Sequence, residues 1–386
     1  MRSKVFLISL ILFLMVGSVM LGFSEPAKAA VDMIKIATHT VGSGNYQLAA
    51  YAAEGIMEKT GISVRCIPAG VESARIMMVR DGTAHAAILD STSSWCLQDG
   101  LYDFASQDWG PQPVRYLWAA LHIGIDWAVR GDSDIYKISD LKGKRVGTFP
   151  GSPSQQSAVE GLLAFGGLTL DDVITVDQPD AVAAYNAVIQ GKLDSNFFNL
   201  ASSQSYELAS MPCGIRYIEL PPTDTEGWKR LIEVQPIAIP RLSTVGGGVS
   251  EQHPIWTYSK GGPVYLSYAN LDEDIAYQIT KSLYESYPVY AKKNDSLKLD
   301  WTIENVLMIF DNDNIPIHKG AIRYLKEIGK WSEERENMNQ KKIEYQEKLR
   351  DLWEATVKEA KEKGIAGEEF KKLWMEKRAA AGLWSR

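Results

Sequence analysis

The sequence predicts an α/β protein in which two lobes follow one plan, each a mixed sheet flanked by helices. Short apolar runs end in small polar turns that lead into helical patterns, and three such junctions fall between residues 38 and 93. A similar junction recurs at 149–154, as though a second lobe repeated the plan. The chain has 386 residues and is 45% hydrophobic, which is enough for two cores.

The first lobe is expected to begin with a buried strand at Met33–Ala37. A polar turn at 38–46 then leads into a helix from Gln47, whose alanines, Ile56 and Met57 recur at helical spacing. Its later strands, each a short apolar run, are expected at 62–68, 84–89, 114–120 and 125–129. The second of its strands opens into the turn 69–73 and the third into Asp90 and the hydroxyls after it, and both turns precede helices.

The second lobe is expected to begin with a capped helical turn at 139–141 and a strand that ends in the turn 149–154. Helices are expected at 155–165 and 180–190, and a strand at 194–200. A long helix at 272–287 belongs to the part of the chain that returns to the first lobe. Crossings near Gly131 and Pro236 would form a hinge. The expected parts are a signal peptide at 1–29, lobe 1 at 30–130 plus 237–330, lobe 2 at 131–236, and a charged amphipathic helical extension at 331–386.

The strand-to-helix junctions point to an anion site, because the first amides of a helix and the positive end of its dipole face outward there. In an open α/β sheet such junctions share the carboxyl edge, where ligands bind. Gly42 and Gly44 also fit the start of a dinucleotide fingerprint, but Gln47 takes the third glycine position. A glycine-rich turn without any ligand is the other alternative, and the recurrence of similar turns argues against it.

Composition and the N-terminus narrow the class of protein. The formal charge of −7 and the lack of a basic stripe argue against a nucleic-acid partner. Arg2, Lys4, the apolar run 5–23 and the small-x-small site 27–29 predict a cleaved signal peptide, with an uncleaved membrane anchor as the alternative. Cys66, Cys96 and Cys213 show no metal-ligand spacing, one disulfide among them stays open, and neither a metal nor a cofactor is expected.

Four motifs carry a resemblance to a known family. They are Thr38–Tyr46, the pair 141–146 and 150–152, the stretch 191–198, and Pro316–Tyr324, which is the most specific. Over about 33–329 the chain resembles the TAXI-type substrate-binding proteins of TRAP transporters. The resemblance implies a type II periplasmic binding fold whose two lobes close on a small organic acid or amino acid.

The resemblance and the polar residues at the strand-to-helix junctions together give a set of candidate ligand-binding residues. They are Thr38, Thr40, Ser43, Tyr46, Glu72, Arg75, Asp90, Ser91, Ser152, Ser154 and Asn199. The sequence departs from the family pattern at 69–72, Arg75, 90–91 and Pro153, which puts the family's usual ligands in doubt.

Two of these assignments have a structural alternative. Arg75 could clamp a carboxylate with both nitrogens, or it could be solvated or paired with Glu72 three residues earlier. Glu72 and Asp90 could bind an amino group of a zwitterionic ligand, or they could cap helices. His318 is expected to hold a turn.

The implied function is a periplasmic receptor, not an enzyme, that delivers a small organic acid to the membrane subunits of a TRAP permease. A receptor for an ATP-driven importer of the thiamine-precursor or sulfonate type is the alternative. An exported enzyme is a third, but no motif of a hydrolase elbow, a zinc site or a catalytic triad is found. The extension is expected to pack on the first lobe, with a homodimer or transporter contact as the sharper hypothesis.

Overall fold

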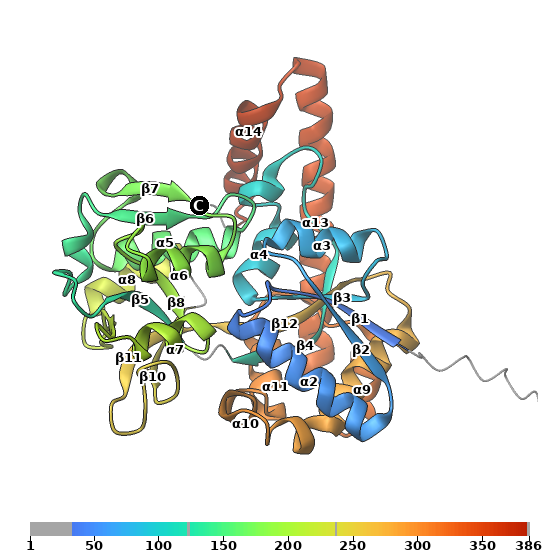
Figure 1. Ribbon diagram of the computed structural model, residues 1–386. Coiled ribbons are helices and arrows are strands. Elements are labelled where there is room, and N and C mark those ends of the chain that lie inside the picture. Colours follow the sequence, from blue (N-terminus) through green and yellow to red (C-terminus); the bar gives the residue numbers. More distant parts are fainter. Residues whose placement is uncertain (1–32, 122–123, 236–237, 384–386) are drawn as a thin grey trace, which may run out of the picture. The chain divides into compact units, whose positions relative to one another are not determined.

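The computed structural model describes residues 33–121, 124–235 and 238–383 (Figure 1). The predicted signal peptide lies outside the described residues. Among the helices described, none combines the length and the apolar character needed to cross a membrane. The predicted fold class is confirmed, because the sheets of each lobe are flanked by helices and a helical extension follows. The first lobe has one mixed sheet, whereas the second has an antiparallel sheet and the parallel pair of β6 and β7.

The first lobe is organised on a sheet with the strand order β2-β1-β3-β12-β4. Its strands are β1 Met33–Thr38, β2 Ser63–Pro68, β3 Ala86–Leu89, β4 Val114–Leu121 and β12 Gly261–Tyr268. Its helices are α2 Gly44–Thr60, α3 Glu72–Arg80, α4 Ser91–Asp99, the 3-10 turn Tyr102–Ala105, α9 Glu273–Tyr290, α10 Asp295–Asp300, α11 Ile303–Asn312 and α12 Lys319–Glu327. The strands β1, β2 and β3 run parallel, whereas β12 is antiparallel to β3 and β4. β3 is buried along its whole length, which explains its unbroken apolar run.

The second lobe repeats this plan. Its strands are β5 Ile125–Arg130, β6 Arg145–Thr148, β7 Ile174–Asp177, β8 Asn196–Asn199, β9 Ile215–Tyr217, β10 Ile239–Ser243 and β11 Ile255–Ser259. Its helices are the 3-10 turns Ile138–Leu141 and Leu170–Asp172, α5 Pro153–Phe165, α6 Ala181–Ile189, α7 Ser203–Ser210 and α8 Thr225–Val234. β6 pairs in parallel with β7 and, through a bridge from Val146 to Ser195, with the segment that leads into β8. β5 then pairs antiparallel with β8, as β12 does with β3 in the first lobe.

The chain changes sheets at positions other than those predicted. β5 pairs with β8 and β9, and β10 and β11 join the same sheet, so residues 125–130 and 239–259 belong to the second lobe. The crossings therefore lie between Leu121 and Ile125 and at Lys260, not near Gly131 and Pro236. Gly131 follows the end of β5 inside the second lobe, and Pro236 lies outside the described residues. Turn residues alone do not show which sheet the next strand joins.

The extension packs on the first lobe, as the first alternative predicted. It consists of α13 Glu333–Lys363 and α14 Gly367–Ala380, drawn in red in Figure 1, with Gly364 at φ 68° closing α13. Leu349 and Trp374 are buried together with Ala105 of the first lobe. The end of α4 is held by polar contacts, since Arg378 pairs with Asp99 at 2.8 Å and both side chains are fully buried.

Candidate functional site

The starts of α3 and α4 in the first lobe meet the start of α5 in the second. Parallel strands place their carboxyl ends at one sheet edge, so the helices that follow them begin there. The two edges face each other and are bridged by hydrogen bonds. Thr40 donates to Asp180 at 2.9 Å, Ser73 donates to the Gly151 carbonyl at 3.3 Å, and Thr92 donates to Gln235 at 2.8 Å. The lobes are therefore closed on each other.

Between these edges lies a cavity of about 50 Å³, which we call the interlobe cavity. Its polar lining is His39, Ser43, Asn45, Glu72, Asp90, Ser154, Gln155, Asn199 and Lys260, and its other lining residues are Gly44, Ile125, Ala158, Ala181, Tyr185 and Phe197. This volume holds only a few water molecules and lies far below the roughly 300–1,000 Å³ of ordinary ligand pockets. A solute could therefore be accommodated only after the lobes move apart.

Lys260 supplies the positive charge at the cavity. It lies at the crossing from β11 to β12, is 1% exposed, and its Nζ is 2.9 Å from Asp90 Oδ2. The same ammonium donates to Ser154 at 2.7 Å and to Thr92 at 3.3 Å, so it joins residues of both lobes. Burial tends to raise the pKa of Asp90, but Lys260 and hydrogen bonds from Ser154 and Ser93 outweigh it and hold this pKa well below its usual range.

Glu72 brings a second carboxylate to the cavity. It is the first residue of α3, is 1% exposed, and its Oε2 accepts the Ser154 amide of α5 at 3.1 Å. Burial and then the nearby Asp90 raise the pKa of Glu72 to about 7, against the lowering effects of Arg75, the Ser154 amide and Lys260. The two carboxylates therefore differ: Asp90 is firmly ionised, whereas Glu72 titrates near neutrality.

Arg75 lies behind the cavity and not among the described residues that line it. Its guanidinium is fully buried and donates to the carbonyls of Ala69 and Gly70 at 3.0 and 3.1 Å. It also stands 3.9 Å from Glu72, which matches the alternative of a pair within α3. Burial lowers the pKa of Arg75, while Glu72, Asp90 and Asp180 act against that shift. In this arrangement Arg75 fixes the turn 69–70 and supports Glu72.

The structure brings about half of the predicted site residues to the cavity. Ser43, Glu72, Asp90, Ser154 and Asn199 line it. The other six are not part of the described lining: Thr38, Thr40, Tyr46, Arg75, Ser91 and Ser152. Asp90 also caps α4 by accepting the Ser93 amide at 2.9 Å. It therefore both caps a helix, as the structural alternative predicted, and lines the cavity.

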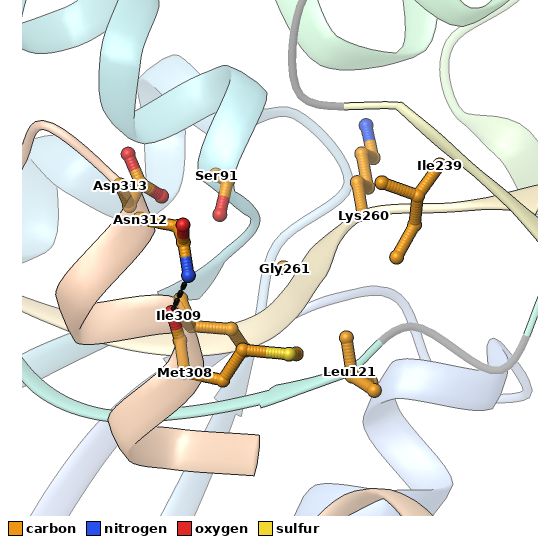
Figure 2. Close-up of a pocket in the computed structure, with 9 residues that line it drawn as sticks. All are labelled: Ser91, Leu121, Ile239, Lys260, Gly261, Met308, Ile309, Asn312 and Asp313. Carbon is orange, nitrogen blue, oxygen red and sulfur yellow. Dashed lines mark hydrogen bonds between the residues drawn. The ribbon is translucent and has the colours of Figure 1, made fainter.

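Ser91 points into a different cavity, of about 400 Å³, next to the crossings (Figure 2). In Figure 2, Met308 and Asn312 of α11 face Ile239 and Leu121 across this second cavity. Lys260 borders both cavities, but its ammonium bonds to Asp90 and Ser154 on the interlobe side. The second cavity has a largely apolar wall and gathers only Ser91 of the predicted site residues, so the interlobe cavity is the better candidate site.

Sequence reasoning missed several residues of the cavity, of which Lys260 matters most. It stands alone between two strand-like runs, and its importance depends on the crossing being at this position. The sequence signal that could have identified Lys260 is its position as a single charged residue between the strand-like runs within 255–268. Asn45 and Phe197 lie within the motifs at 38–46 and 191–198 but were not singled out, and Gln155 and Tyr185 belong to no motif.

The residues at 33–121, 124–235 and 238–383 contain no group of three or more His, Cys, Asp or Glu side chains placed to hold a metal ion. Cys66, Cys96 and Cys213 are all free thiols. His318 caps α12 by accepting the Gly320 amide at 3.1 Å, which confirms its role in a turn.

Comparison with solved structures finds several binding proteins. The alkanesulfonate-binding protein SsuA of Xanthomonas axonopodis pv. citri, bound to MOPS, is 11% identical, with 93% of this chain and 100% of that chain covered and a TM-score of 0.45. The periplasmic aliphatic sulphonate binding protein SsuA of Escherichia coli is 13% identical over 83% and 94% of the chains, with a TM-score of 0.44. An arginine-specific periplasmic binding protein of Salmonella typhimurium is 11% identical over 70% and 99%, with a TM-score of 0.42.

A family model gives the firmer result. It matches residues 36–329, which include both sheets and both crossings but not the extension. The chain therefore belongs to the NMT1-like family.

Proposed function

We propose that the protein is a solute receptor that holds a small organic acid, without altering it, between its two lobes. The observation that carries the proposal is the meeting of the starts of α3, α4 and α5 around Lys260. Helix amides and a buried ammonium are the groups that bind a carboxylate or sulfonate away from water. Asn45, Asn199 and Gln155 would supply further hydrogen bonds to the polar part of the solute.

Closure would follow from rotation about the two crossings. The chain passes from one sheet to the other between β4 and β5 and again at Lys260, and a hinge needs only a few such connections. The bonds from Thr40 to Asp180 and from Thr92 to Gln235 would break when the lobes part and form again around the solute.

The membrane partner is proposed from the sequence. The motifs at 38–46 and 316–324 resemble TAXI-type receptors, which favours delivery to the membrane subunits of a TRAP permease, from a periplasmic location reached by means of the N-terminal signal. An ATP-driven importer is the competing partner. Neighbouring genes that encode an ATPase in place of TRAP membrane subunits would decide for it. A homodimer through the extension stays a prediction.

A larger side chain at position 44 in place of Gly44 is expected to weaken solute binding. A Cβ at this first residue of α2 would lie 3.1 Å from the carbonyl carbon of Ala201 in the opposite lobe, and 3.1 Å from Asn199 Oδ1. In Gly44→Val the larger side chain should cost the closed arrangement about 1–3 kcal/mol, as overpacking does. Affinity for an acid found by thermal-shift screening of carboxylates, sulfonates and amino acids should fall by roughly 5- to 150-fold in calorimetry.

Met57→Val, on the exposed side of the same helix, serves as the control and should bind like the wild type. Far-UV circular dichroism would verify that both variants are folded. Equal affinity in the wild type and in Gly44→Val would mean that the solute does not bind between the lobes.

A further inference from the structure

We infer that the Glu72 carboxylate occupies the anion-binding position at the start of α5, next to the Ser154 amide, which we call the acid seat. A bound solute must displace Glu72 from this position to place its own acid group there. The inference rests on the proposed function, because it concerns the position that the acid group of the solute would take. Glu72 belongs to the first lobe and α5 to the second, so the contact exists only while the lobes are closed.

The start of α5 has the properties of an anion seat. Pro153 is the first residue of the helix and has no N–H, so the amides of Ser154 and Gln155 are the ones that face outward. Ser152 precedes the helix without capping it, and its fully buried hydroxyl has no hydrogen-bond partner within the described part of the chain. The hydroxyl of Ser154 is itself bonded to Lys260 and Asp90.

Glu72 occupies this seat as a ligand acid would. Its Oε2 accepts the Ser154 amide at 3.1 Å, and its side chain is 1% exposed. Arg75, held by two carbonyls of the turn 69–70, supports it from behind at 3.9 Å.

The occupant is weakly held, which lets a solute replace it. Four groups face Glu72: Asp90 at the start of α4, Arg75 on its own helix, Ser154 on α5, and Lys260 at the crossing. Burial and Asp90 together outweigh the other three and raise the pKa of Glu72 to about 7. Opening would return this pKa toward its ordinary value of 4.5, so closure takes up a proton.

Glu72 favours the closed arrangement at low pH. Below about pH 4.5 Glu72 is protonated in both arrangements, and the advantage it gives to the closed one is fully present. As the pH rises through about 7 this advantage is lost, because the closed arrangement then buries an anion. Small-angle scattering of solute-depleted protein should therefore give a smaller radius of gyration at pH 6 than at pH 8. Glu72→Gln, which cannot ionise, should remove this difference.

The decisive experiment uses acetate as a probe of the seat in full-length protein freed of solute by unfolding and refolding. Glu72→Ala empties the seat, so acetate at about 100 mM, against chloride at equal ionic strength, should raise its melting temperature by roughly 2 °C or more. The wild type and Glu72→Gln, whose side chains still fill the seat, should not respond. Ser73→Ala, which removes a neighbouring bond between the lobes, is the matched control and should not respond either.

An equal acetate response in all four proteins, or none in Glu72→Ala, would overturn the inference. With a solute identified by screening, Glu72→Ala should bind it about tenfold more tightly at pH 8, whereas weaker binding would make Glu72 a direct ligand and contradict displacement. If no solute binds the wild type but acetate stabilises Glu72→Ala, the seat is correct and the proposed function fails. If solutes bind the wild type and acetate has no effect on the variant, the proposed function stands and the inference fails.

Discussion

Replacing Lys260 by methionine is expected to lower the free energy of unfolding by about 3–5 kcal/mol. The ammonium is 1% exposed and lies 2.9 Å from Asp90, so its removal leaves a carboxylate buried without its counter-charge. Methionine fills nearly the same volume, and the loss would therefore report the charge and not a cavity. Urea unfolding followed by tryptophan fluorescence provides the measurement.

The control is Lys144→Met. Lys144 pairs with Asp134 at 3.0 Å, but the lysine side chain is 33% and the aspartate 80% exposed, so this variant should lose at most about 1 kcal/mol. The double variant Lys260→Met with Asp90→Asn should recover much of the loss, because neither charge is then buried alone. A Lys260→Met variant as stable as Lys144→Met would contradict the buried pair.

The second large effect is expected in the extension, where Arg378→Met should also cost about 3–5 kcal/mol. Arg378 and Asp99 are both fully buried, their nearest charged atoms are 2.8 Å apart, and the guanidinium also donates to the Asp99 carbonyl at 2.8 Å. Asp99 ends α4, whose other end carries Asp90 at the interlobe cavity. The extension thus holds in place a helix that forms part of the site.

Arg350→Met is the matched control on α13, because Arg350 and its partner Asp351 are 60% and 71% exposed at 3.3 Å. Its unfolding midpoint in urea should stay close to that of the wild type. If Arg378→Met unfolded at the same urea concentration as Arg350→Met, the extension would be only loosely attached to the first lobe.

Local sequence patterns were sufficient to predict several strands and helix starts, although β7, β9, β10 and β11 were not predicted. The junctions at 38–46, 69–73 and 149–154 all lie where helices begin, and they bring Ser43, Glu72 and Ser154 to one cavity. Hydrophobic period and capping residues are properties of a few neighbouring residues, so they can be read without knowledge of the fold. The amphipathic pattern of the extension likewise predicted that it packs on the first lobe, where Leu349 is buried with Ala105.

Features that depend on contacts between distant residues could not be predicted in the same way. The crossings were placed near Gly131 and Pro236 because turn residues are local, whereas the sheet that a strand joins is decided by pairing far along the chain. Lys260 was missed for that reason. Arg75 was predicted either to clamp a ligand or to pair with Glu72, and the sequence left both open. The carbonyls of Ala69 and Gly70 accept hydrogen bonds from its guanidinium, a contact that spacing alone does not reveal.

Identification of the solute tests the central claim most directly. Protein purified under native conditions would be denatured, and the small molecules it releases would be identified and quantified by mass spectrometry. We predict that the wild type releases an organic carboxylate or sulfonate in nearly equimolar amount and that Gly44→Val releases much less. Release of equal amounts by both proteins, or of no organic acid by a wild type that no acid in the thermal-shift screen stabilises, would contradict a receptor that grips an anionic solute between its lobes.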